Sequence, residues 1–181
     1  MKKILLSFSL IIGLLFSAMA QKQDSKYKIS VGAEVLIPSG SAAEYNGTGY
    51  GASVQGEYKL LPNLSATLSG AYISLPYSKL YKEMVDPWLT SPLKNRVYYP
   101  VKGGAKYYFG KYFYGAAEAG ASITTDVSSA TSFAYAGGLG TSLSIAEKSN
   151  LDLGIRYETW ALSTSSTVSF IGVRAAYAFG F

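Results

Sequence analysis

The stretch that most constrains this chain is 167–181, TVSFIGVRAAYAFGF, in which two kinds of side chain alternate. Successive side chains of a β-strand point to opposite faces. One face is therefore apolar and aromatic, and the other is small apart from Arg174. An aromatic ladder at a frayed, hydrated terminus is unusual in a soluble protein, whereas a strand that faces lipid can carry one. The stretch favours a membrane-embedded β-strand.

The same period of two recurs along the rest of the chain. The eight alternating segments are 27–37, 48–60, 64–73, 97–109, 112–123, 132–145, 151–162 and 167–181. Short turns follow the second, fourth and sixth, and longer connections follow the first, third and fifth. Short periplasmic turns and longer external loops are typical of outer-membrane barrels. The sequence predicts an all-β fold: an eight-stranded, antiparallel, up-and-down transmembrane β-barrel over 27–181, with both termini in the periplasm.

The N-terminus has the build of a secretory signal peptide. Lys2 and Lys3 precede an apolar run, and Ala18-Met19-Ala20 supplies a cleavage pattern of small residues. The run of about 13 residues is shorter than the roughly 20 that a spanning helix needs. We expect residues 1–20 to be removed after export through the Sec route, leaving 21–26 as a periplasmic lead to the barrel.

Composition agrees with a membrane barrel and excludes several chemistries. Charged residues are 15% of the chain, against about 25% in soluble domains. Loss of residues 1–20 would lower the formal net charge from +5 to +3, because two lysines leave. That charge is too small to indicate nucleic-acid binding. The sequence has no Cys and no His, so disulfides, thiolate ligands and imidazole ligands are excluded.

The charged residues within the predicted strands share the face opposite the aliphatic and aromatic one. These are Lys28, Glu34, Glu57, Lys59, Lys102, Lys106, Glu118, Asp152, Arg156, Glu158 and Arg174. In a soluble lipocalin-like barrel this face would meet water, but Ser, Gly and Ala dominate it. Small residues with nearly balanced charges suit the narrow interior of eight strands, which side chains fill. We therefore expect the apolar face to meet lipid.

Buried charges must pair. We predict a structural network of ion pairs and hydrogen bonds in the lumen, formed by Glu57, Lys102, Lys106, Glu118, Arg156, Glu158 and Arg174.

Aromatic residues fall near both ends of the predicted strands. Tyr27, Tyr58, Tyr107, Phe109, Phe113, Tyr177 and Phe179 lie near the periplasmic ends, and Tyr50, Tyr72, Tyr99, Phe133 and Tyr135 lie near the external ends. Two aromatic belts are what the two membrane interfaces select.

Two adjacent segments carry a family resemblance. The stretch 99–109, YPVKGGAKYYF, the stretch 113–120, FYGAAEAG, and the final Phe181 resemble the small OmpA/OmpX-like outer-membrane barrels, especially the β-barrel domain proteins of Bacteroidetes-type bacteria. The resemblance implies insertion by the barrel-assembly machinery. It also implies that the C-terminal aromatics Tyr177, Phe179 and Phe181 are the assembly signal.

Enzymatic chemistry finds little support. Outer-membrane barrels with acyltransferase, deacylase, phospholipase or omptin-like protease activity place a His among their catalytic residues, and this chain has none. Ser–Lys or carboxylate-pair catalysis remains open in principle. Glu57, Glu118 and Glu158 could converge in the lumen, but a filled lumen admits no substrate. We expect no catalytic residue, metal site or cofactor.

The longest break between strands, 74–96, has interaction character. It mixes aromatic and cationic side chains: Tyr77, Lys79, Tyr81, Lys82, Trp88, Lys94 and Arg96. That composition suits lipopolysaccharide phosphates or a partner protein. The alternative is a solvated external loop that rests on the barrel rim.

The sequence thus predicts a monomeric, non-enzymatic outer-membrane barrel with a structural, adhesion or surface-contact role. Its expected surroundings are outer-membrane lipid and lipopolysaccharide, and an extracellular partner stays unspecified. Three alternatives remain: a small pore, an outer-leaflet lipid-modifying enzyme that works without His, and a secreted, soluble lipid-binding barrel.

Overall fold

The computed structural model describes residues 25–181, apart from 89–90, 92, 125–129 and 164–165. The strands are β1 (Tyr27–Ser39), β2 (Gly49–Leu61), β3 (Leu64–Leu75), β4 (Arg96–Phe109), β5 (Phe113–Thr124), β6 (Ala130–Ala146), β7 (Ser149–Ser163) and β8 (Ser166–Gly180). Their bounds differ from the predicted ones by two residues at most. The predicted signal peptide lies outside the described residues.

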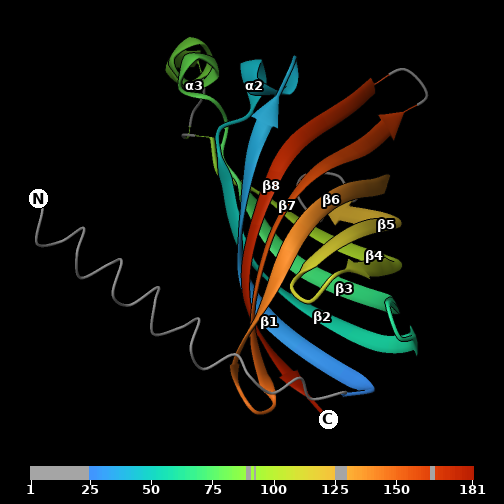
Figure 1. The fold of residues 1–181 in the computed structure, drawn as a ribbon. Coiled ribbons are helices and arrows are strands. Elements are labelled where there is room, and N and C mark those ends of the chain that lie inside the picture. The colour runs from blue at the N-terminus through green and yellow to red at the C-terminus, as the bar shows by residue number, and fades with distance from the viewer. Residues whose placement is uncertain (1–24, 89–90, 92, 125–129, 164–165) are drawn as a thin grey trace, which may run out of the picture.

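The sheet closes on itself. Each strand pairs antiparallel with the next in sequence, and β1 pairs with β8 to complete the barrel (Figure 1). The N–H of Phe181 donates to the carbonyl of Tyr27 at 2.8 Å, so the first and last strands meet at the end that holds the short turns. Closure satisfies the backbone groups that an open sheet edge would leave unpaired. The eight-stranded antiparallel barrel predicted from the sequence is confirmed.

The register decides which face is inside. On β1, Glu34 is buried and pairs in register with Arg174 of β8, while the adjacent Val35 is exposed. All twelve belt aromatics that the sequence singled out are exposed on the outer wall, from Tyr27 to Phe179. The apolar face is therefore outside. A lipocalin-like arrangement, which would place that face inside, is contradicted.

Small residues let the strands approach closely on the inner face. At Gly104 of β4, a side-chain Cβ would overlap the backbone oxygen of Ala117 on β5. A glycine here permits a close approach that any larger residue would disturb.

Two connections predicted as loops contain short helices. Residues 38–47 include α2 (Ala42–Tyr45), and 74–96 includes α3 (Lys79–Val85) followed by the 3-10 turn η1 (Asp86–Trp88). Ser78 caps α3, because its Oγ accepts a hydrogen bond from the N–H of Tyr81 at 3.2 Å. The capping serine followed by strong helix formers was a local signal that the prediction of a loop missed.

Among the described residues, no helix is both long and apolar enough to span a membrane.

Candidate functional site

The two lysines of β4 organise the barrel interior. Lys102 and Lys106 are four residues apart, so they lie on the same face of the strand. Both are buried, which places that face inside the barrel. The Nζ of Lys106 lies 2.9 Å from Asp152 Oδ2 and 3.4 Å from Glu57 Oε2. The Nζ of Lys102 lies 2.8 Å from Glu158 Oε2 and 3.6 Å from Glu118 Oε2. Each lysine therefore joins carboxylates from two different strands.

Two arginines extend these ion pairs to the β7–β8–β1 wall. The Nε of Arg156 donates to Glu158 Oε2 at 2.7 Å, and its Nη2 donates to Glu34. The Nε of Arg174 lies 3.4 Å from Glu34 Oε1 and donates to Ser53 Oγ at 2.9 Å. Glu34 thus lies between two guanidinium groups.

The structure brings all seven predicted network residues into ion pairs with one another or with further carboxylates. Glu34 and Asp152 also belong to the network. Sequence reasoning placed both on the inner face but did not include them in the network. Period two identifies the face of a residue, whereas its partner depends on strand register.

An apolar cluster closes the interior at the end that carries the longer loops. It consists of Leu36, Ile73, Leu75, Tyr98, Ala134, Trp160 and Phe170. The Trp160 ring lies 4.8 Å from the Tyr98 ring and 4.7 Å from the Phe170 ring, centroid to centroid. Its Nε1 donates to Glu158 Oε1 at 2.8 Å, which joins the apolar cluster to the ion pairs. The predicted network did not include this cluster.

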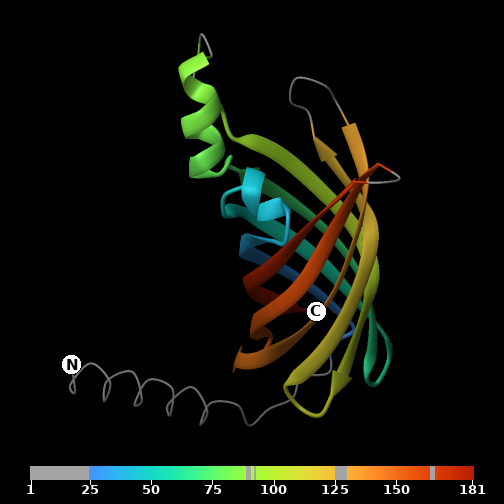
Figure 2. The ribbon, with the colours of Figure 1, turned by 90° about the horizontal axis from the view of Figure 1, so that it is seen from above.

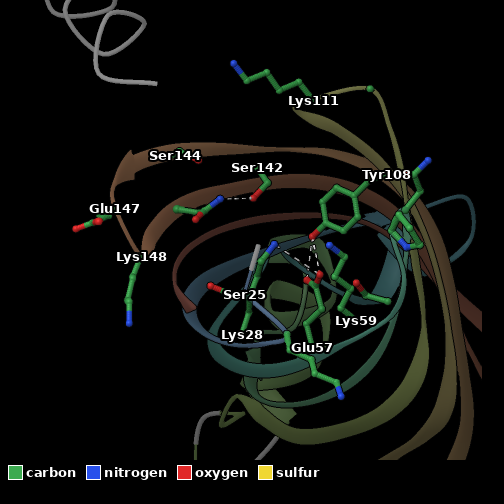
Figure 3. A pocket seen from close by; sticks show the side chains of 16 residues that line it. Ser25, Lys28, Glu57, Lys59, Tyr108, Lys111, Ser142, Ser144, Glu147 and Lys148 are labelled. Atoms are coloured by element: carbon green, nitrogen blue, oxygen red, sulfur yellow. Dashed lines mark hydrogen bonds and ion pairs between the residues drawn. The ribbon is translucent and has the colours of Figure 1, made fainter. Parts of the chain in front are cut away.

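The opposite end holds a cavity of about 100 Å³ between the short turns. Figure 3 shows Tyr108 and Lys28 directed at Glu57, whereas Lys111 and Lys148 point away. The Tyr108 hydroxyl donates to Glu57 Oε1 at 2.8 Å, and Lys28 Nζ lies 3.8 Å from the same oxygen.

A second cavity, of about 50 Å³, lies beside Lys106, Arg156 and Arg174. Both cavities are far smaller than the roughly 300–1,000 Å³ of small-molecule sites. Within the described part of the chain, no three or more Asp or Glu side chains are grouped to hold a metal ion.

The external connections form a compact structure that we call the external ledge, made of residues 42–47 and 76–88. Backbone hydrogen bonds join its two halves: the N–H of Ser78 donates to the carbonyl of Tyr45 at 3.0 Å, and that of Gly47 donates to Pro76 at 2.9 Å. Stacking of Tyr77 on Tyr81, with ring centroids 5.4 Å apart, stiffens it further.

The predicted contact residues divide between the inside and the outside of the external ledge. Tyr77 and Tyr81 are half-buried, and the Arg96 guanidinium lies 4.4 Å from the Tyr77 ring centroid. Lys79, Trp88 and Lys94 are exposed, and Lys82 is half-buried. Surface contact is thus open to the cations and to Trp88, while the tyrosines hold the ledge together.

A closed eight-stranded barrel, apolar and aromatic outside and charged inside, defines the class of outer-membrane β-barrels. The family model described as "Outer membrane protein beta-barrel domain" matches residues 8–179. The chain belongs to this family.

Solved structures of other proteins share the fold. The attachment invasion locus protein Ail of Yersinia pestis is 16% identical, with 87% of this chain and 100% of that chain covered at a TM-score of 0.57. Neisserial surface protein A (NspA) is 15% identical, with 88% of this chain and 100% of that chain covered at a TM-score of 0.60. The outer membrane protein OprG of Pseudomonas aeruginosa is 12% identical, with 87% of this chain and 96% of that chain covered at a TM-score of 0.55.

Identities this low show the fold alone. A search of curated protein sequences gave no significant match. The Bacteroidetes-type resemblance stays a prediction.

Proposed function

We propose that this protein is a non-enzymatic integral outer-membrane barrel that acts through its outer wall and its external segments. The filled interior carries the proposal. Lys102 and Lys106 of β4 pair with carboxylates of β7 across the lumen, and Arg156 pairs with Glu34 and Glu158. Trp160 and Phe170 belong to the apolar cluster at the loop end. Among the described residues, the cavities beside these side chains measure only about 100 and 50 Å³, which supports a function carried by the outer surface.

Conductance in planar bilayers tests the filled interior. We expect the purified, refolded protein to give no steady current steps above the bare lipid. Stable steps of one size would favour the small-pore alternative. Mass spectra of lipid A from expressing and non-expressing cells test the lipid-modifying alternative, and we expect no difference between them.

The exposed cations on and beside the external ledge support a surface-contact role. The exposed Lys79 and Lys94, with the half-buried Lys82, lie on the connection between β3 and β4. Their ammonium groups suit phosphate-bearing glycolipids or acidic partners. We propose contact with lipopolysaccharide phosphates as the first candidate, and adhesion to an extracellular partner as the second.

A matched pair of charge variants tests this role. Cells expressing the wild type, K79Q/K94Q or K111Q/K148Q are compared for retention on surfaces coated with lipopolysaccharide or with extracellular matrix. Lys111 and Lys148 lie at the opposite end of the barrel, so the second variant controls for net charge. We expect retention to fall in the external variant alone. Equal retention by all three proteins would remove the surface-contact role.

The orientation and biogenesis belong to the same proposal. Residues 1–20 act as a cleaved Sec signal, 21–26 lead into the barrel, and both termini lie in the periplasm. The meeting of Tyr27 and Phe181 at the end with the short turns supports this orientation. Tyr177, Phe179 and Phe181 present the signal to the barrel-assembly machinery, and the barrel functions as a monomer.

A further inference from the structure

An apolar stripe runs along the outer side of α3 and η1. Leu80, Met84 and Trp88 follow one another at intervals of four residues, which places them on one helical face. They are 73%, 68% and 88% exposed, and neither α3 nor η1 has a buried residue. Three large apolar side chains in a row form an exposed apolar patch, whose contact with water is unfavourable and which marks an interaction site.

The stripe belongs to an amphipathic helix. Val85 and Tyr81 continue the apolar arc, whereas Lys79, Lys82 and Glu83 occupy the other side at about 100° per residue. Tyr81 is the residue that fixes the helix, because its ring contacts the rings of both Tyr77 and Tyr45. The helix is therefore held on the side of its apolar arc where Tyr81 and Val85 are half-buried. Leu80, Met84 and Trp88, in the rest of the arc, stay exposed.

The helix connects two strands that carry part of the external aromatic belt. It connects β3 to β4, and these strands carry the belt residues Tyr72 and Tyr99, whose rings meet edge to face at 5.7 Å. Tyr72 is three residues from the end of β3, and a tilted strand rises about 2.5 Å per residue along the membrane normal. The end of β3 therefore lies roughly 8 Å beyond the belt, and α3 begins four residues later, at Lys79.

The helix projects from the end of the barrel that carries the longer connections. Figure 1 shows α3 almost end-on, and Figure 2, turned by 90°, shows it lengthwise beside the barrel wall. In both views α3 lies beyond the strand ends that carry the longer connections, to one side of the barrel. Amphipathic interfacial helices bury their apolar face about 5–10 Å into the headgroup and acyl boundary.

We propose that Leu80, Met84 and Trp88 insert into the outer leaflet of the membrane that the barrel spans, so that α3 is an interfacial lipid anchor. The lipid is the occupant that the structure favours because the stripe lies on the connection between β3 and β4, two strands whose outer faces carry the belt residues Tyr72 and Tyr99. Lys79 and Lys82, on the polar side, then lie at the level of lipid phosphates, where lysine side chains extend toward the headgroups. This inference rests on the proposed membrane insertion of the barrel.

Trp88 reports its own surroundings. The sequence has two tryptophans, and the other, Trp160, is 1% exposed in the lumen. The difference between the emission of the wild type and of W88F therefore isolates Trp88. The protein is refolded into phosphatidylcholine–phosphatidylglycerol vesicles whose acyl chains carry bromine near the headgroup or near the bilayer centre. Iodide in the water serves as the opposing quencher.

We expect the Trp88 emission to be blue-shifted, quenched more by shallow than by deep bromine, and protected from iodide. The double variant L80S/M84S should reverse these effects, whereas E83S, on the polar side of the same helix, should not. If iodide quenches Trp88 and brominated lipid does not, in a barrel that still shows heat-modifiable migration, the inference is overturned. The barrel proposal then stays intact.

Two further results are also decisive. Protection of Trp88 from iodide could rise with the density of protein in the vesicles while brominated lipid has no effect on its emission. That result would assign the stripe to a contact with a second copy of the chain and overturn the lipid assignment. Loss of the heat-modifiable band in vesicles would overturn the membrane insertion and the anchor together.

Discussion

Lys102 Nζ and Glu158 Oε2 lie 2.8 Å apart, although 56 residues separate them in the sequence and two strands stand between β4 and β7 in the wall. This ion pair crosses the lumen. Glu158 also accepts hydrogen bonds from Arg156 and from the Trp160 indole. One carboxylate therefore joins the charge network to the apolar cluster above it.

Replacing that carboxylate should strongly destabilise the barrel. In E158Q the cations of Lys102 and Arg156 lose a buried counter-charge, and breaking a buried ion pair on one side costs about 3–5 kcal/mol. We expect urea unfolding of the refolded barrel, followed by tryptophan fluorescence, to report a loss of this size. The control E147Q removes an exposed carboxylate in the β6–β7 turn and should change little. Equal stability of the two variants would mean that the Glu158 ion pairs add nothing to the free energy of unfolding.

Two adjacent glycines should differ in their response to the same substitution. In G104A the new Cβ would overlap the Ala117 backbone oxygen, whereas in G103A the nearest atom, the Thr67 oxygen, is 3.9 Å away. Overpacking of this kind costs about 1–3 kcal/mol. We expect G104A to lower the folded fraction in unboiled gel samples and G103A to match the wild type. A normal folded fraction in G104A would show that the neighbouring strand gives way.

The absence of cysteine allows the orientation to be read by single-cysteine labelling. A membrane-impermeant maleimide should label E83C, on α3, in intact cells. It should label K148C, in the β6–β7 turn, after the outer membrane is permeabilised. Both side chains are exposed, so accessibility is matched. The reverse pattern would place the termini outside the cell.

Substitution of Phe181 distinguishes an effect on assembly in the cell from an effect on the stability of the folded barrel. Its ring is exposed, while its N–H donates to Tyr27, a hydrogen bond that F181A retains. If the aromatic ring is the assembly signal, F181A should lower the amount of folded barrel in the outer membrane several-fold. Purified F181A should still refold in detergent with an unchanged urea midpoint. A parallel loss in both measurements would indicate a structural role for the ring instead.

Sequence reasoning reached the fold but only part of the interior. It located all eight strands within two residues because a period of two in side-chain character is a local property. It missed α3, whose seven residues are short beside the alternating segments. It also omitted Glu34 from the network, because Glu34 meets Arg174 and Arg156 only after β8 has closed on β1.

By itself the sequence determined the strand count, the two faces of each strand and the absence of thiol and imidazole chemistry, since all of these follow from residue identity and spacing. The tertiary structure alone decided which charges meet, because partners in a barrel depend on the register and on closure of β1 against β8. It alone also left Leu80, Met84 and Trp88 exposed, on a helical segment that contacts α2. That position is set by the contacts that hold α3 against α2, which join residues far apart in the chain.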